Sequence, residues 1–213
     1  MPLDVFLFDL DGTLVDSAAD LATAVNLLRT ELSLDPLSID AVRGMVGDGA
    51  TMLVRRALPD DRFSPERLAR FLHHYRAHLL DQTRVYPEIS DFLMAHQGKK
   101  MAVVTNKPAD LAGALLFELG LLPFLSCLVG GDSGLPKKPD PAPVFQALRE
   151  LQADPERAVL FGDHHTDLNA GRAAGIRTCF CAYGFGRADD VPWDFRAEQP
   201  ADLLRLFPPD RPA

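Results

Sequence analysis

The most constraining feature of this chain is a short apolar run, Val5-Phe6-Leu7-Phe8, that leads directly into Asp9-Leu10-Asp11-Gly12-Thr13. Four apolar residues are too few for a helix and predict a buried strand of a parallel sheet. Ligands of open α/β sheets bind at the carboxyl ends of strands, where this turn would lie. Extended geometry points Asp9 and Asp11 to one side, and a divalent cation would relieve their repulsion. The alternative is an N-capping aspartate beside a turn aspartate.

Apolar periodicity predicts mostly helices before residue 84 and alternating strands and helices after it. The expected helices begin after Ser17 and continue at 39–45, 51–58, 65–80, 88–98, 108–119, 141–151, 167–174 and 201–206, and the expected strands are 5–8, 101–105, 125–129, 158–161 and 178–182. Short strands with helical crossovers predict an α/β fold with a Rossmann-like, doubly wound parallel sheet. We expect a core of residues 1–15 and 85–213, with an inserted all-helical cap of residues 16–84.

The composition of the 213 residues narrows the class of protein. A formal charge of −8 without any Lys/Arg cluster predicts neither nucleic acid nor an anionic membrane as a partner. No apolar run approaches the ~20 residues of a membrane span, and no signal-peptide pattern precedes the first strand. The three cysteines, Cys127, Cys179 and Cys181, lie in apolar segments and are expected to be reduced thiols. We therefore expect a cytoplasmic protein.

Two further segments carry groups suited to a phosphate. Thr105-Asn106-Lys107-Pro108 follows a predicted strand, so a hydroxyl and the start of the next helix could hold phosphoryl oxygens. Lys138 stands directly before Pro-x-Pro at a helix entrance and is a point charge for an anion, a position that fits it better than the neighbouring Lys137. The alternatives are that Thr105 or Asn106 caps a helix and that the lysine is a solvated turn residue.

A second acidic pair follows the predicted strand at 158–161. Asp163 ends that strand and Asp167 falls in the first helical turn after it, a spacing that suits Mg²⁺, which prefers oxygen ligands. Asp167 could instead cap the helix. His164 and His165 follow Asp163, and they either face solvent or line the metal side, where they would favour Mn²⁺ or Co²⁺.

In this order, the four motifs resemble those of the haloacid dehalogenase superfamily of phosphatases, in which an aspartate is the nucleophile. The resemblance covers nearly the full length: Asp9-x-Asp11-Gly-Thr, Thr105-Asn106-Lys107, Lys138-Pro-x-Pro and Gly162-Asp163-x-x-x-Asp167. The helical insertion is similar to the mobile cap of that family. Residues 42–50 and 130–133 resemble those of phosphoglycolate phosphatases in particular.

The resemblance implies Mg²⁺-dependent hydrolysis of a small phosphomonoester, 2-phosphoglycolate above all, through an aspartyl-phosphate. Asp9 would attack phosphorus, and Asp11 would protonate the leaving alkoxide and then activate water. The other implied roles are Mg²⁺ binding by Asp9, the Asp11 carbonyl and Asp163, phosphoryl binding by Thr105, the Asn106 amide and Lys138, and support of Lys138 or of a metal-bound water by Asp167.

In the cap, Gly47-Asp48-Gly49 gives the backbone freedom to close over the site, and Arg43 lies one turn earlier. Such a loop could bind the part of the substrate beyond the phosphate through Gly47, and Arg43 would suit a carboxylate. The alternative is an ordinary junction between two helices.

Several other activities share these motifs. Phosphatases for amino-sugar phosphates, nucleotides or pyrophosphate, and a β-phosphoglucomutase, would use the same core residues. Asp11 argues against a haloalkanoate dehalogenase, and the absence of any lysine before Lys99 argues against a phosphonoacetaldehyde hydrolase. The intact motifs and the long insertion argue against a non-enzymatic phosphate-binding module. The expected partner is a small phosphorylated metabolite, and the chain is expected to be a monomer or homodimer.

Overall fold

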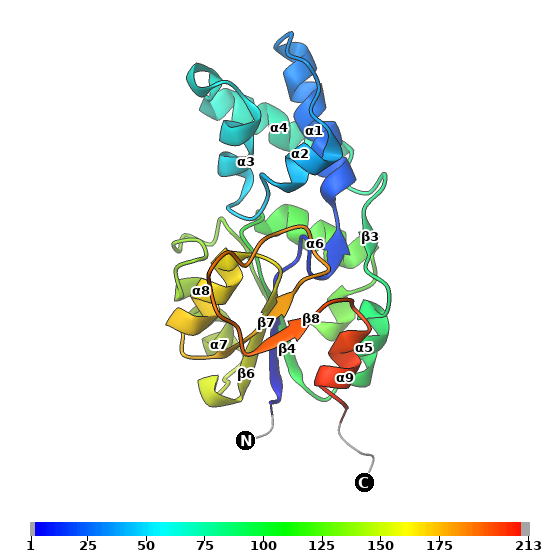
Figure 1. Ribbon diagram of the computed structural model, residues 1–213, viewed down its shortest axis with the longest axis vertical. Helices are drawn as coiled ribbons and strands as arrows, with labels where there is room; N and C mark the ends of the chain where they lie inside the picture. The colour runs from blue at the N-terminus through cyan, green and yellow to red at the C-terminus, as the bar shows by residue number, and fades with distance from the viewer. Residues whose placement is uncertain (1–2, 210–213) are drawn as a thin grey trace.

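The structure is a computed structural model that describes residues 3–209 (Figure 1). The strands are β1 (Val5–Phe8), β2 (Val15–Asp16), β3 (Arg84–Val85), β4 (Lys100–Val104), β5 (Cys127–Val129), β6 (Ala158–Gly162), β7 (Arg177–Cys181) and β8 (Phe195–Ala197). The α-helices are α1 (Ala18–Glu31), α2 (Ile39–Arg43), α3 (Ala50–Ala57), α4 (Pro65–Ala77), α5 (Ile89–Ala95), α6 (Ala109–Glu118), α7 (Ala142–Glu150), α8 (His165–Ala173) and α9 (Asp202–Leu206).

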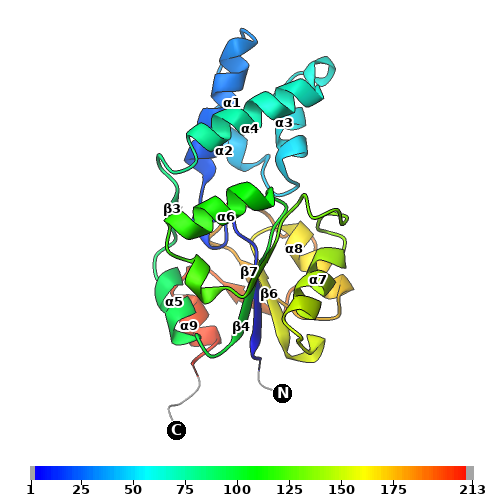
Figure 2. The ribbon, with the colours of Figure 1, turned by 180° about the vertical axis from the view of Figure 1, so that it is seen from behind.

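Six strands form one parallel sheet in the order β5-β4-β1-β6-β7-β8. Helices α5, α6 and α9 cover one face of the sheet, and α7 and α8 cover the other (Figures 1 and 2). Side chains alternate across β1, so Phe6 and Phe8 pack on the first face and Val5 and Leu7 pack on the second. Helices cover both faces, which confirms the predicted doubly wound α/β architecture.

Helices α1 to α4 lie between β2 and β3 in the chain and form a layer above the carboxyl end of the sheet (Figure 1). The chain leaves and re-enters the sheet region through β2 and β3, which pair antiparallel with Val15 opposite Val85. Beside this pair, the fully buried Asp20 carboxylate accepts hydrogen bonds from the backbone N–H of Gln82 and Thr83. The start of α1 is thus tied to the segment that precedes β3.

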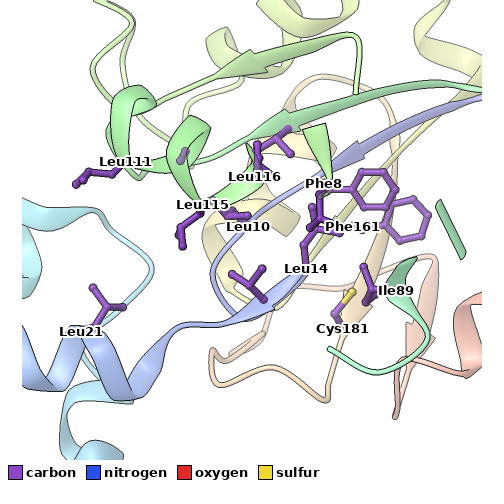
Figure 3. Close-up of a cluster of buried hydrophobic side chains, with 14 of the residues drawn as sticks. Phe8, Leu10, Leu14, Leu21, Ile89, Leu111, Leu115, Leu116, Phe161 and Cys181 are labelled. Atoms are coloured by element: carbon purple, nitrogen blue, oxygen red, sulfur yellow. The ribbon is translucent and has the colours of Figure 1, made fainter. Parts of the chain in front are cut away.

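One buried cluster joins the two layers. It includes Phe8 and Phe161 of the sheet, Leu111 of α6 and Leu21 of α1 (Figure 3). Burial of apolar side chains from the helical layer and the sheet in one cluster supports the helical layer over the sheet.

The structure differs from the predicted elements mainly where they are short. Strands β2, β3 and β8 were not expected, because two or three residues carry too little periodicity to be recognised. At the start of α1, the Ser17 hydroxyl donates to Asp11, and the Asp16 side chain accepts from Ala18 N–H. Within residues 3–209 the three cysteines are free, and no helix is long and apolar enough to cross a membrane.

Candidate active site

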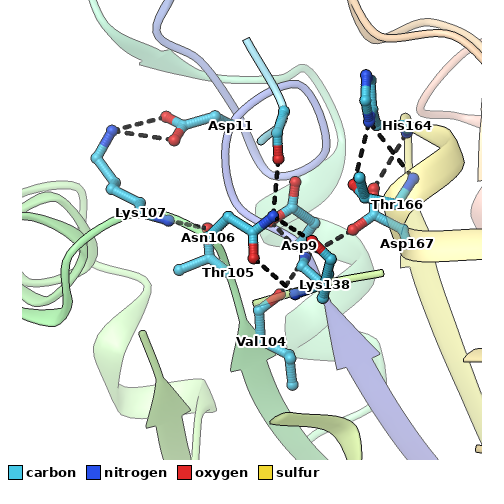
Figure 4. Close-up of polar contacts among 11 residues, drawn as sticks. Asp9, Asp11, Val104, Thr105, Asn106, Lys107, Lys138, His164, Thr166 and Asp167 are labelled. Atoms are coloured by element: carbon cyan, nitrogen blue, oxygen red, sulfur yellow. Dashed lines mark hydrogen bonds and ion pairs between the residues drawn. The ribbon is translucent and has the colours of Figure 1, made fainter. Parts of the chain in front are cut away.

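Six of the predicted site residues meet at the carboxyl ends of the sheet strands: Asp9, Asp11, Thr105, Asn106, Lys138 and Asp167 (Figure 4). Asp9, Thr105 and Asp163 are each the first residue after one of these strands. Asp9 N–H still donates to the carbonyl of Phe161 over 2.8 Å, so the sheet holds the backbone of the first aspartate. The topology alone brings together residues that lie far apart in the chain.

Lys138 is the cation at the centre of this site. Its ammonium lies 2.9 Å from Oδ1 of Asp9 and 2.6 Å from Oδ1 of Asp167, and it donates to the carbonyl of Val104. Burial disfavours the ammonium, but the charges of Asp167 and Asp9 outweigh burial and raise the pKa of Lys138. Lys138 therefore remains a fixed positive charge beside Asp9.

The surroundings of Asp9 disfavour its ionised form. Burial raises the pKa of Asp9 to about 6, and the charge of Asp167 adds to this, while Lys138 opposes it. The carboxylate thus ionises near neutral pH only because a cation lies beside it.

Asp9, Asp163 and Asp167 form a buried acidic group, with one oxygen of each within 4.8 Å of the others. Burial, followed by the charge of Asp9, raises the pKa of Asp163 well above its ordinary value. Three buried carboxylates served by one lysine fit a hard divalent cation, which prefers oxygen ligands and would relieve their repulsion. The site can therefore hold a metal ion.

Backbone groups surround the Asp163 carboxylate. Its Oδ2 accepts hydrogen bonds from Phe185 N–H at 3.0 Å and Gly186 N–H at 2.7 Å. A Cβ at Gly12, where φ is +86°, would lie 2.0 Å from Oδ2, and a Cβ at Gly184 would lie 2.5 Å from the same atom. These glycines leave room for the carboxylate where any other residue would fill it.

Asp167 is fully engaged as a positioning residue. Its Oδ1 faces Lys138, and its Oδ2 accepts from His164 N–H at 3.1 Å within the capping box of α8. With both oxygens occupied, Asp167 holds Lys138 in place and fixes the start of α8 at the same time.

The Asn106 side chain joins three parts of the site. Its amide oxygen accepts from Lys138 N–H, and its NH₂ group donates to the carbonyls of Lys138 and Gly47, all at 2.9–3.0 Å. Both polar groups of the side chain thus hold the backbone of Lys138 and Gly47. The backbone N–H of Asn106 is therefore the group of this residue that remains a candidate for phosphoryl binding. Thr105, which is buried and faces the same cavity, supplies a hydroxyl.

Sequence reasoning gave Lys107 no role, yet the structure places it in the site. Its ammonium lies 2.9 and 3.0 Å from the two oxygens of Asp11 (Figure 4). It also lies 2.6 Å from the hydroxyl of Tyr75, a residue of α4. Asp11 also accepts a hydrogen bond from Ser17. The one sequence signal was the position of Lys107 inside the Thr-Asn-Lys motif, while its partner on α4 had no visible signal.

A cavity of about 40 Å³ lies between the two layers and is lined by Asp9, Asp11, Leu21, Val46, Gly47, Gly49, Ala50, Leu53, Phe71, Leu72, Tyr75, Thr105, Asn106, Lys107, Pro108 and Leu111. The candidate catalytic residues line the side of the cavity formed by the sheet, and mostly apolar residues line the side formed by the helical layer. A reacting group held there would be shielded from bulk water.

Arg43 does not line this cavity, and its predicted role in substrate binding stays a prediction. Its guanidinium pairs with Asp16 at 3.1 Å and Asp40 at 3.5 Å, and it faces a second hollow on the outer side of the loop at 47–49. The carboxylate of Asp16, at the start of the helical layer, is the nearest carboxylate to Arg43 and pairs with its charge. Gly47 does line the cavity, as expected.

His164 and His165 lie in that second hollow with Asp48, not among the three buried carboxylates. Burial, followed by the charge of His165, lowers the pKa of His164 to about 4. The His164 ring packs against Gly47, where a Cβ would lie only 2.8 Å from it. The His164 ring thus supports the loop at 47–49. Asp48, His164 and His165 also lie close enough together to hold a metal ion, so metal binding by these histidines stays a prediction.

Comparison with known proteins places the chain in a family. The family model described as haloacid dehalogenase-like hydrolase matches residues 6–181. A phosphoglycolate phosphatase of Aquifex aeolicus is 38% identical over 95% of this chain and 96% of its own length, and one of Chromobacterium violaceum is 39% identical over 94% of each. A crystal structure of a predicted phosphoglycolate phosphatase from Haemophilus somnus has a TM-score of 0.86, with 28% identity over 96% of this chain and 97% of that one. The chain therefore belongs to the haloacid dehalogenase-like hydrolases.

Proposed function

We propose that this protein is a Mg²⁺-dependent phosphatase that hydrolyses 2-phosphoglycolate through an aspartyl-phosphate on Asp9. The observation that carries the proposal is the contact of the Lys138 ammonium with Asp9 and Asp167 beside the cavity. This arrangement keeps a buried carboxylate ionised and places a positive charge where a phosphoryl group would meet it.

The reaction consists of two in-line displacements at phosphorus. In the first, an oxygen of Asp9 attacks phosphorus, the bond to the leaving-group oxygen breaks, and Asp11 supplies a proton to that oxygen. In the second, Asp11 takes a proton from water, the water oxygen attacks phosphorus, and the bond to Asp9 breaks. The products are the alcohol and inorganic phosphate, and both carboxyl groups return to their starting states.

Lys138 and the end of β4 would stabilise the charge on the phosphoryl group. Lys138 holds Asp9 in position, and Thr105 with the backbone N–H of Asn106 would donate to phosphoryl oxygens. These groups are fixed before substrate arrives, because Asp167 and the Asn106 side chain hold Lys138. Their fixed positions are what makes them effective at the transition state.

Asp9, Asp163 and the backbone carbonyl of Asp11 would hold the Mg²⁺ ion. When bound, Mg²⁺ supplies positive charge that offsets the repulsion between the nucleophile and the phosphoryl oxygens. Asp167 would remain outside this set, because Lys138 and His164 N–H already occupy its oxygens.

The leaving group that we propose is short. The relatives named phosphoglycolate phosphatase support a two-carbon acid as the leaving group. We propose that residues 16–84 act as a cap that separates from the remainder, residues 1–15 and 85–213, to admit it.

We place this activity in the cytoplasm, on a small phosphorylated metabolite, with the chain as a monomer or homodimer that needs neither nucleic acid nor a membrane. The three free thiols support a reducing compartment.

The test is kcat/KM for 2-phosphoglycolate with Mg²⁺, beside sugar phosphates, nucleotides and pyrophosphate. We expect a value of about 10⁴ M⁻¹s⁻¹ or above for 2-phosphoglycolate and much lower values for the others. Asp9→Asn should abolish turnover, and EDTA should remove activity that Mg²⁺ restores. Equal, weak rates on all esters would contradict the substrate, and full activity of Asp9→Asn would contradict the mechanism.

A further inference from the structure

Lys107 and Tyr75 form a polar pair in the wall of the cavity, with one residue from each layer. Lys107 belongs to the loop between β4 and α6, Tyr75 belongs to α4, and the two are 6% and 2% exposed. The ammonium lies 2.6 Å from the Tyr75 hydroxyl and 4.4 Å from the centre of its ring. The pair exists only while the helical layer lies on the sheet.

The Tyr75 hydroxyl holds a proton for which residues 3–209 supply no acceptor. An ammonium can only donate, so Tyr75 accepts the hydrogen bond from Lys107 and its own O–H remains to be satisfied. Burial raises the pKa of Tyr75 to about 12, so the hydroxyl is not ionised at neutral pH. A buried donor without an acceptor, in the wall of a cavity, points to a ligand that accepts a hydrogen bond there.

The charge in the cavity wall indicates an anionic ligand group. Among the described residues that line the cavity, Asp9, Asp11 and Lys107 carry charge, and Lys107 is the single cation. The remaining wall is mostly apolar, with Leu53 and Phe71 from the helical layer. A second negative group of the substrate could be accommodated here only beside Lys107, because a buried charge needs an opposite partner.

We propose that Lys107 and Tyr75 bind the carboxylate of the substrate's leaving group, and so select two-carbon acids among phosphomonoesters. The inference rests on the proposed phosphatase function, and it assigns the carboxylate to Lys107 in place of Arg43. Because Lys107 also contacts both oxygens of Asp11, the same ammonium would keep the leaving-group oxygen close to the acid that protonates it.

The test compares two substrates that differ at one group. 2-Phosphoglycolate carries a carboxylate where 2-hydroxyethyl phosphate carries a CH₂OH group of similar size. We expect Lys107→Met to lower kcat/KM for 2-phosphoglycolate about 10- to 100-fold more than for 2-hydroxyethyl phosphate. Tyr75→Phe, which removes one oxygen atom, should reduce the same preference about 10-fold. Lys100→Met, which removes an exposed lysine at the opposite end of β4, is the matched control and should keep the preference.

Binding gives a second measurement that does not need turnover. In the Asp9→Asn background, 2-phosphoglycolate should bind more tightly than 2-hydroxyethyl phosphate, and Lys107→Met should remove the difference. If Lys107→Met does not fold, Tyr75→Phe and Lys107→Arg carry the test, and retention of the full preference in Tyr75→Phe would overturn the role of its hydroxyl.

The outcomes separate this inference from the function on which it rests. Equal losses on both substrates in Lys107→Met would overturn the carboxylate site and leave the phosphatase activity standing. A wild-type enzyme that hydrolyses other phosphomonoesters but not 2-phosphoglycolate would overturn both the substrate and the inference. A protein without activity on any ester would overturn the proposed function itself.

Discussion

The Nζ atom of Lys138 lies 2.9 Å from Oδ1 of Asp9, although 129 positions separate the two residues in the chain. Both side chains are buried, so their interaction is weakly screened by solvent. The pair depends on the loop that leads into α7 being held against the end of β1, and Asn106 provides that support.

Replacing Lys138 by methionine should lower kcat about 10³-fold or more, because Asp9 and Asp167 would then lie together without a cation. Steady-state kinetics at saturating Mg²⁺ measure the effect. Lys137→Met is the matched control, because Lys137 is the neighbouring lysine but is not paired with Asp9 or Asp167, and it should change kcat less than tenfold. A larger loss of kcat in Lys137→Met than in Lys138→Met would mean that Lys137, and not Lys138, is the lysine that supports Asp9.

The raised pKa of Asp9 predicts how stability depends on pH when divalent cations are chelated. With a folded-state pKa of about 6 against an ordinary value of 3.8, the folded protein keeps this proton at pH values where the unfolded chain has lost it. Protonation of Asp9 therefore stabilises the folded protein fully below about pH 4, and this stabilisation disappears as the pH rises through about 6.

Asp9→Asn lacks this titration. Its free energy of unfolding, relative to wild type, should rise by about 2 kcal/mol between pH 4 and pH 7. Urea unfolding in EDTA across this range measures the difference. A wild-type and variant difference that stays constant with pH would show that Asp9 titrates normally.

Gly47→Ala should weaken the contact between the loop at 47–49 and the sheet. The residue has φ of +125°, and a Cβ would lie 2.8 Å from the His164 ring. We expect a loss of stability of about 1–3 kcal/mol and a KM raised about tenfold. Thermal unfolding and kinetics together provide the measurement.

Two variants isolate the steric part of that effect. Gly120→Ala is the control for backbone strain alone, because Gly120 has φ of +71° with open space around it. The double variant Gly47→Ala/His164→Ala should recover part of the KM, since the ring that the new methyl group meets is gone. Strictly additive effects would mean that His164 does not contact this loop.

Asp20→Ala should destabilise the protein by about 2–3 kcal/mol, because the N–H groups of Gln82 and Thr83 would lose their buried acceptor. Asp20→Asn keeps an acceptor oxygen and should retain about half of that stability. Urea unfolding of the two variants is the measurement. If both variants lose the same amount, the charge of Asp20, rather than its hydrogen bonds, stabilises the connection between α1 and β3.

The sequence allowed the sheet and its catalytic end to be predicted, because the relevant signals are local. A short apolar run followed by Asp9, or by Thr105, or by Asp163, contains both the strand and the group that it presents. The partners Lys107 and Tyr75 could not be paired in advance, since one lies on α4 and the other after β4, and only the packing of the two layers brings them together.

Arg43 is a residue whose neighbours could not be predicted from its place in the sequence. Its charge and its place before the glycine-rich loop suggested a substrate contact, but the nearest carboxylate in the fold belongs to Asp16. Which of several acidic groups an arginine meets depends on the direction in which a five-residue helix leaves the sheet, and periodicity does not specify that direction.

The three side-chain hydrogen bonds of Asn106 connect it to two different parts of the molecule. Two bind the backbone of Lys138, and one binds Gly47 in the loop of the helical layer. If residues 16–84 separate from the sheet as proposed, Asn106 would lose its hydrogen bond to Gly47 and keep the two to Lys138, so Lys138 would stay in place. Substrate could then enter and phosphate could leave without Asp9 and Lys138 having to pair again at each turnover.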